Sequence, residues 1–254
     1  MIHPTAIIDP TAKISDNVQI GPYSVIGADV EIGEGTWVGP HVVIQGPTRI
    51  GRDNKVYQFA SLGEVPQDLK FKGERTFLEI GDRNVFREFC TLNRGTMQDQ
   101  GRTLIGNDNL FMSYVHIAHD CRVGNHTIFA NNASLAGHVV VGDYVVFGAF
   151  SGVFQFCRIG MHSFIAGNAA VIKDVPPYIK VSGHYAKPFG LNTVGLQRRG
   201  FEKDVLTLIR RAYKIVYRSG LTATAAVAAL REMNHPVLAP LIEFIESSTV
   251  GIVR

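Results

Sequence analysis

An apolar residue recurs at every sixth position along most of the chain, and this period limits the fold more than any other feature. The run extends from Ile2 to Leu62, reappears at Ile80, Phe86 and Leu92, and continues without a break from Ile105 to Val171. Neither an α-helix nor an alternating β-strand has a period of six. Stacked coils of three six-residue sides do have it, and their apolar side chains would form one continuous core. We therefore predict an all-β solenoid.

Small residues accompany the apolar positions. Glycine often follows directly, as at Gly21 and Gly33, and because glycine tolerates positive φ we expect these residues to form the corners. The three cysteines, Cys90, Cys121 and Cys157, each stand two positions before an apolar position. An odd number of separated cysteines argues against a disulfide framework or a zinc ribbon. We interpret all three as small packed side chains.

Two segments interrupt the period. Between Leu62 and Ile80 the expected apolar positions hold Asp68 and Glu74, which cannot line an apolar core without partners. We expect a functional loop here, because loops that leave a regular solenoid often carry function. Residues 97–102 should form a second loop, for which a tolerated surface insertion is an equal alternative.

The period ends at DVPPY (174–178), and helical patterns follow. A stripe of apolar residues predicts a helix from about 201 to 219, with further helices at about 222–233 and 237–248. The stripe consists of Leu206, Ile209, Tyr213 and Val216. We therefore predict two units, a β-helix over residues 1–185 and a small helical domain over 186–254.

Composition excludes several classes of protein. The net charge of +3 is too small to indicate a nucleic-acid partner. The first residues lack the basic and apolar regions of a signal peptide, and no apolar run reaches the length of a membrane span. We expect a cytoplasmic protein without a transmembrane segment.

Four of the nine histidines, including His119 and His138, lie within residues 114–138. If three sides make one coil, residues eighteen apart lie above one another. Gly137 and Gln155 then stack on His119, while His138 and Phe156 stack on the neighbouring Asp120. The histidine-rich stretch should therefore form two adjacent columns of side chains at one corner of the solenoid.

These columns suit acyl transfer. An imidazole near neutral pH can accept a proton from a hydroxyl group and return it to a leaving group. A neighbouring carboxylate such as Asp120 would fix its tautomer, and the N–H of Gly137 could stabilise an oxyanion. We predict that His119 is a general base.

Other interpretations stay open. The histidines could be ordinary surface residues of a non-catalytic, partner-binding solenoid, or zinc ligands as in hexapeptide-repeat carbonic anhydrases. The HxxH spacing of His116 and His119 needs further ligands from elsewhere, so we assign no metal. The basic residues Arg198, Arg199, Arg210 and Arg211 suit phosphates, an acidic carrier protein or solvent equally well.

Several motifs together are more specific than the period: LGEVPQDLK (62–70), HIAHDC (116–121), NNASLAGH (131–138), DVPPY (174–178) and GLQRRGF (195–201). Over essentially its full length the chain resembles the UDP-N-acetylglucosamine 3-O-acyltransferases that open lipid A synthesis in Gram-negative bacteria. The resemblance implies a left-handed parallel β-helix, a homotrimer with active sites between subunits, and 3-hydroxyacyl-acyl carrier protein as donor. The acyl group is carried on phosphopantetheine, and no further cofactor is implied.

The resemblance also implies residue roles. His119 would deprotonate the sugar 3-hydroxyl, Asp120 would orient His119, and the Gly137 amide would stabilise the oxyanion. Gly167 matches a position that sets acyl length, and its missing side chain suggests a longer chain. The residues expected to bind substrate are Asp68, Lys70, His116, His138 and Gln155 at the sugar-phosphate, and Asn192, Arg198 and Arg199 at the nucleotide and diphosphate.

The chain departs from the family at three positions. Relatives often have histidine in place of Phe154 and Asn93, and glutamate in place of Val194. Against this family, the missing acid at 194 implies that details of uridine recognition differ. The two missing histidines leave His119 as the stronger candidate for the base.

Overall fold

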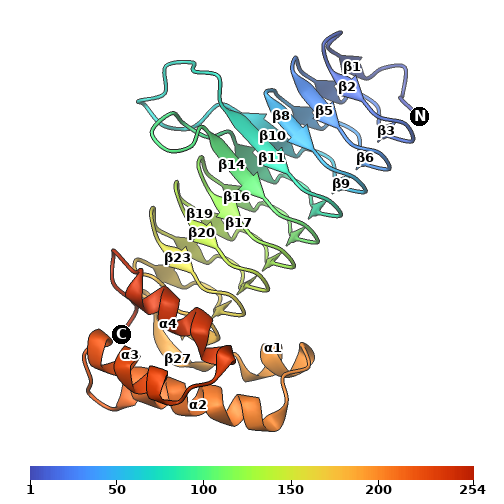
Figure 1. Cartoon of the computed structure of the whole chain (residues 1–254). Helices are drawn as coiled ribbons and strands as arrows, with labels where there is room; N and C mark the ends of the chain where they lie inside the picture. Colours follow the sequence, from blue (N-terminus) through green and yellow to red (C-terminus); the bar gives the residue numbers. More distant parts are fainter.

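The computed structural model describes residues 1–254, that is, the whole chain. It is the expected left-handed parallel β-helix, with a group of helices packed at its C-terminal end (Figure 1). Short strands form three long parallel sheets, one for each side of the coil, and only the last two strands pair antiparallel.

Sheets I, II and III take every third strand in turn. Sheet I contains β1 (Ile7–Ile8), β4 (Val25–Ile26), β7 (Val43–Ile44), β10 (Ser61–Glu64), β13 (Thr91–Asn93), β16 (His116–Ile117), β19 (Ser134–Leu135), β22 (Gly152–Val153) and β25 (Ala170–Val171). Sheet II contains β2 (Lys13–Ile14), β5 (Val30–Ile32), β8 (Thr48–Ile50), β11 (Phe77–Ile80), β14 (Arg102–Ile105), β17 (Arg122–Val123), β20 (Val140–Val141) and β23 (Arg158–Ile159). Sheet III contains β3 (Gln19–Ile20), β6 (Trp37–Val38), β9 (Lys55–Val56), β12 (Val85–Phe86), β15 (Leu110–Phe111), β18 (Ile128–Phe129), β21 (Val146–Phe147), β24 (Phe164–Ile165), β26 (Ile179–Ser182) and β27 (Lys187–Leu191).

The apolar positions form the core, as predicted. The second residue of nearly every two-residue strand is buried, and the first faces outward. Inside sheet III, Phe86, Phe111, Phe129 and Phe147 stack with ring centroids 4.3–5.0 Å apart. The first coils are less covered than the rest: Ile8 and Ile14 are only partly buried, and Ile2 remains 46% exposed because no further coil covers this end.

The prediction that the glycines after the apolar positions form the corners is wrong. The corner residues with positive φ stand three positions after most of the apolar positions and are mostly not glycine; Asp120 (φ 60°) and His138 (φ 63°) are two of them. Glycine directly after the apolar position instead allows two coils to approach closely. A Cβ atom on Gly21 would lie 2.7 Å from the backbone carbon of Gly39.

The cysteines are packed in the core, as predicted. Cys90, Cys121 and Cys157 are free thiols and buried. Burial raises the pKa of Cys90 and Cys121 to about 12 and that of Cys157 to about 11, so none is a reactive thiolate at neutral pH.

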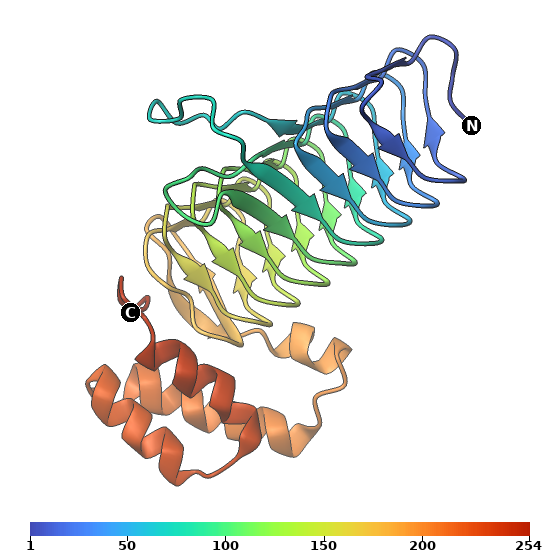
Figure 2. The same ribbon diagram turned by 45° about the horizontal axis from the view of Figure 1, so that its top comes forward.

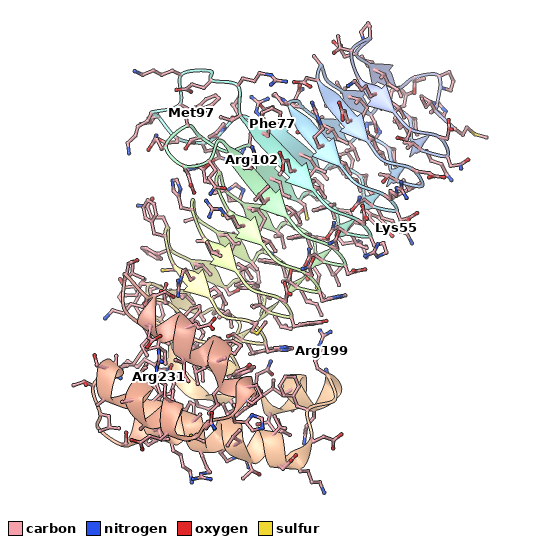
Figure 3. All side chains as sticks on the ribbon, in the orientation of Figure 1. Lys55, Phe77, Met97, Arg102, Arg199 and Arg231 are labelled. Atoms are coloured by element: carbon pink, nitrogen blue, oxygen red, sulfur yellow. The ribbon has the colours of Figure 1, made fainter.

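Two loops leave the solenoid near its middle, at the interruptions of the period. The first joins β10 to β11 and the second joins β13 to β14. Figure 2 shows the longer loop projecting from the coil, and Figure 3 places Met97 on the shorter loop beside it. Nε2 of Gln98 lies 3.4 Å from Oδ2 of Asp68, so the two loops are in contact.

The C-terminal part contains α1 (Thr193–Arg198), α2 (Lys203–Arg218), α3 (Ala223–Glu232), a 3-10 turn η1 (Pro236–Leu238) and α4 (Ala239–Glu246). The three longer helices confirm the predicted ones, except that the last begins as a 3-10 turn, with Pro240 in the first turn of α4. The β26–β27 hairpin and α1 were not predicted. The division at residue 185 stays a prediction; it falls in the turn between the paired β26 and β27.

None of the helices has both the length and the apolar composition needed to cross a bilayer. Tyr178 and Arg158 attach the helices to the last coils: the Tyr178 hydroxyl donates to the carbonyl of Val237 (2.9 Å), and Arg158 donates to that of Phe244 (2.8 Å).

Candidate active site

Two columns of side chains lie at the corner between sheets I and II, as the eighteen-residue spacing predicted. Backbone hydrogen bonds connect the coils here, from His138 N to His119 O (3.0 Å) and from Phe156 N to Gly137 O (3.2 Å). The ring of His138 stacks on that of Phe156 at 4.6 Å between centroids and is perpendicular to the ring of His119.

Asp120 is the centre of a buried hydrogen-bond network. Its Oδ2 accepts from Nδ1 of His119 (2.9 Å) and from the hydroxyl of Thr96 (2.7 Å), while Oδ1 accepts from the Thr96 N–H (2.8 Å). The carboxylate has no exposed surface. Burial alone would raise the pKa of Asp120, but the hydrogen bonds from His119 and Thr96 hold it below its usual range. Asp120 is therefore ionised at neutral pH.

His119 has its second ring nitrogen free for a substrate. Because Nδ1 faces Asp120, Nε2 points the other way, beside Gly137. A Cβ atom on Gly137 would lie 2.6 Å from Cε1 and 2.8 Å from Nε2 of His119. Only glycine fits here without moving the imidazole. The Gly137 N–H makes no hydrogen bond within the chain.

A cavity of about 500 Å³ opens above these residues. Its lining is mostly polar and comes from the corner and both loops: Gln67, Asp68, Leu69, Lys70, Gln98, His119, His138, Gln155 and Phe156. The N–H of Lys70 donates to Asp68 (2.9 Å) and lowers the pKa of that carboxyl. The structure thus brings together seven of the predicted residues: Asp68, Lys70, His119, Asp120, Gly137, His138 and Gln155.

His116 faces a neighbouring surface. It points outward from β16, where its Nδ1 lies 2.7 Å from the hydroxyl of Thr91. It lines an apolar groove with Gly152, Phe154 and other residues of sheet I. Burial, with a smaller effect of His119, lowers the pKa of His116, so the ring is neutral at neutral pH.

The remaining predicted residues do not line the cavity within one chain. Gly167 lies at the corner between sheets III and I, on the other edge of sheet I. Asn192 caps α1 and donates to the carbonyl of His162 (2.9 Å). The guanidinium of Arg199 lies 4.3 Å from the centre of the Tyr144 ring, and Figure 3 shows Arg199 near the helices, far from Met97. Arg198, in the last turn of α1, belongs to the same region.

Residues of the shorter loop were missed. Thr96, Gln98 and Asp99 all reach the site, although from the sequence alone a tolerated insertion was an equal alternative for this loop. The break in the period was the one signal that could have pointed to them.

His119, Asp120 and His138 are also the one group of histidine, cysteine or carboxylate side chains with spacing near that of metal ligands, their atoms lying within 4.8 Å of one another. Oδ2 of Asp120 accepts hydrogen bonds from His119 and Thr96, so a zinc ion at these three residues would compete with that network. The observed network favours proton transfer.

Two family models match the chain. One, described as bacterial transferase hexapeptide (six repeats), matches residues 29–64 and 102–137. The other, described as UDP N-acetylglucosamine O-acyltransferase, domain 2, matches residues 174–253.

Curated relatives match over the full length. The acyl-(acyl-carrier-protein)–UDP-N-acetylglucosamine O-acyltransferases of Thiobacillus denitrificans and Halorhodospira halophila are 54% and 53% identical, with 100% of this chain and 99% of each relative covered. Among solved structures, LpxA of Acinetobacter baumannii superposes with a TM-score of 0.98 at 51% identity, and 100% of this chain and 99% of that one are covered. The UDP-N-acetylglucosamine O-acyltransferase of Moraxella catarrhalis does so with a TM-score of 0.98 at 48% identity and the same coverage. With this identity along its whole length, the chain belongs to the UDP-N-acetylglucosamine O-acyltransferase family.

Proposed function

We propose that this acyltransferase moves a 3-hydroxyacyl group from acyl carrier protein to the 3-hydroxyl of UDP-N-acetylglucosamine, with His119 as the general base. This reaction would be the first step of lipid A biosynthesis and would take place in the cytoplasm. The observation that carries the proposal is the pair of His119 and buried Asp120, whose free imidazole nitrogen faces a polar cavity beside the Gly137 N–H.

The reaction uses these three groups in turn. Nε2 of His119 takes the proton of the sugar hydroxyl as its oxygen attacks the thioester carbon, forming the new C–O bond. The Gly137 N–H donates to the oxyanion of the tetrahedral intermediate. When the C–S bond breaks, His119 returns the proton to the phosphopantetheine sulfur. Asp120 stabilises the imidazolium between the two transfers.

Four polar residues that line the cavity would bind the acceptor. Asp68 and Lys70 come from the longer loop, while His138 and Gln155 come from the corner. Together they offer a carboxylate, an ammonium group, an imidazole and an amide, which suits a sugar with several hydroxyls and a phosphate.

A neighbouring subunit supplies the rest of the site. Gly167, Asn192, Arg198 and Arg199 lie away from the His119 cavity in one chain, so they can serve this reaction only across a subunit contact. A homotrimer would place the nucleotide-binding residues of one subunit against the catalytic corner of the next. His116 and the apolar groove beside it would face the same contact.

The donor arrives on a partner protein. An acidic carrier fits the exposed Arg210 and Arg211 of α2, and the thioester on its phosphopantetheine supplies the acyl group. No metal or other cofactor takes part. Gly167 has no side chain that could shorten the acyl site, so we expect a long acyl chain to be accepted; a Cβ atom there would lie 3.2 Å from the carbonyl oxygen of Ala149.

The direct test replaces the base. His119→Ala should lower kcat by about 10²- to 10⁴-fold while the trimer elutes and melts as the parent protein does. His126→Ala, which removes a partly exposed histidine from another corner, is the matched control and should keep full activity. Near-normal turnover of His119→Ala would reject the mechanism.

The two alternatives are tested alongside. A zinc hydratase requires stoichiometric metal in the purified protein and loss of activity with a chelator. A non-catalytic solenoid should not bind UDP-N-acetylglucosamine in calorimetry.

A further inference from the structure

The site contains a second carboxylate–imidazole pair, formed by Asp99 and His138. Oδ2 of Asp99 lies 3.6 Å from Nδ1 of His138, and Nε2 of the same ring lies 3.8 Å from Oδ2 of Asp120. The side chain of His138 is only 11% exposed, so water screens these contacts weakly. The imidazole thus lies between two carboxylates, at ion-pair distance from each, with Phe156 against its face.

Arg122 fixes the carboxylate of Asp99. Its Nη2 atom lies 2.8 Å from each of the two oxygens of Asp99. The residue points outward from β17, so a regular strand of sheet II holds a loop residue in place. These are the only side-chain hydrogen bonds of Arg122, whose Nε is buried without a partner.

The shorter loop therefore reaches both imidazoles of the site. Thr96 binds Asp120, which holds His119, and Asp99 stands against His138 only three residues later. A bond from Gly101 N to Thr96 O (3.1 Å) closes the loop between these contacts and keeps the two side chains at a fixed separation.

We propose that Asp99 is a positioning residue for acyl transfer, which keeps a proton on Nδ1 of His138 and fixes that ring at the acceptor pocket. A carboxylate facing a ring nitrogen favours the tautomer that carries hydrogen there. Oδ2 of Asp120 already accepts hydrogen bonds from His119 and Thr96, whereas Oδ2 of Asp99 accepts only from Arg122, so Asp99 is the freer acceptor for His138. The other charged or titratable groups around the ring are His119, Asp120, Asp68 and Lys70. The inference rests on the proposed function in one respect, that His138 contacts the acceptor.

The chain offers a matched control at another corner. Asp108 receives two hydrogen bonds from Arg83 (2.7 and 2.8 Å), and Nε2 of His126 lies 3.9 Å from its Oδ2. This group has the same three residue types, but it lies between sheets II and III and does not contact Asp120.

The first experiment compares Asp99→Asn with Asp108→Asn in the full-length trimer. Asp99→Asn should lower kcat/KM by about tenfold or more, because small displacements of a positioned group are costly, whereas Asp108→Asn should leave it unchanged. Asp99→Glu should restore part of the loss. Arg122→Gln should reduce kcat/KM less than Asp99→Asn, since the carboxylate itself remains.

A double-mutant cycle separates positioning from a purely structural role. His138→Asn is the second variant, because asparagine occupies the equivalent left-handed corner position at Asn132 and Asn168. If Asp99 acts through His138, Asp99→Asn should cause no further loss of kcat/KM in that background. An undiminished loss there, or full activity of Asp99→Asn alone, would overturn the proposal.

The spectroscopic test does not depend on turnover. The ring nitrogen signals of His138, identified by their absence in His138→Asn, should show the Nδ1–H tautomer at alkaline pH in the parent protein and a shift towards Nε2–H in Asp99→Asn. An unchanged tautomer contradicts the inference. Near-normal turnover of His119→Ala would reject His119 as the general base and with it the proposed mechanism. The tautomer of His138 would still decide whether Asp99 positions that ring.

Discussion

Nδ1 of His119 lies 2.9 Å from Oδ2 of Asp120, a carboxylate with no exposed surface. Both residues stand at one corner, where Asp120 has the αL conformation (φ 60°) that recurs at the corners of the solenoid. The repeat thus supplies the backbone positions of the pair. The hydrogen bonds from Thr96 add to it from outside the repeat.

Replacing Asp120 by asparagine should abolish most activity. An amide keeps the shape of the side chain but no longer selects the tautomer or stabilises the imidazolium, so kcat should fall by about 10²- to 10⁴-fold. Steady-state kinetics at saturating substrate measure this effect. A decrease of only a few-fold would mean that His119 is oriented without the carboxylate.

The same variant should change the pH dependence of stability. The pKa of Asp120 is lower in the folded protein than in the unfolded chain, so its ionisation stabilises the fold above the unfolded pKa. That contribution is lost as the pH falls through the folded value. Melting curves of parent and Asp120→Asn should differ at neutral pH and converge in acid, at or below the usual carboxyl range; a constant difference would contradict this.

Thr96→Val should destabilise the protein and slow the reaction. The substitution keeps the shape but removes the hydroxyl that donates to buried Asp120 at 2.7 Å. A hydrogen bond to a charged group contributes about 1.5–3 kcal/mol to the free energy of unfolding. Denaturant unfolding and kcat should both report the loss.

Thr76→Val is the matched control for that experiment. The hydroxyl of Thr76 is buried and has no hydrogen-bond partner. Its removal should leave the free energy of unfolding unchanged or raise it slightly, because an unsatisfied buried polar group is lost. Equal destabilisation by both substitutions would show that the Thr96–Asp120 hydrogen bond makes no contribution of its own to the free energy of unfolding.

His162 should make the fold sensitive to mild acid. Burial, and then the charge of Arg199, lower the pKa of this histidine to about 4. The unfolded chain therefore binds a proton more readily, and stability should decrease as the pH falls from about 6.5 towards 4.

The variant His162→Phe should remove part of this decrease. Its ring can keep the stack with Tyr144, and phenylalanine already occupies corner positions with positive φ at Phe150 and Phe156. Across this pH range, the melting temperature of the parent should fall further than that of His162→Phe. Parallel curves would exclude His162 as the source.

Much of the fold could be predicted because one local rule repeats. The apolar position at Ile117 has the same environment as those at Leu135 and Val153, so the same pattern specifies every coil. The stacking of Gly137 on His119 follows from that rule alone. Where the period stopped, prediction failed: the β26–β27 hairpin depends on pairing with the last coils, which no local pattern announces.

The same limit applies to the site. Residues on the repeat, such as Gln155, could be placed by counting, but Thr96 and Asp99 lie on a loop whose path has no period. Nothing in the sequence around Asp120 and Arg122 indicates that these two residues bind side chains of a loop. The role expected for the glycines was wrong for a related reason, because the distance between coils is a property of the stacked structure.

Gly137→Ala provides the sharpest test of the column of groups at the catalytic corner. The new methyl group would lie 2.6 Å from Cε1 of His119, so the imidazole must move or the coils must separate. If the ring moves, kcat/KM should fall by about 10²-fold although the N–H of residue 137 is retained. The two effects can be separated, because in a His119→Ala background the clash is absent and Gly137→Ala should lower the melting temperature less than it does in the parent protein. Equal destabilisation in both backgrounds would place the clash in the backbone instead of the imidazole, and full activity of Gly137→Ala would mean that the base need not occupy the position beside the glycine.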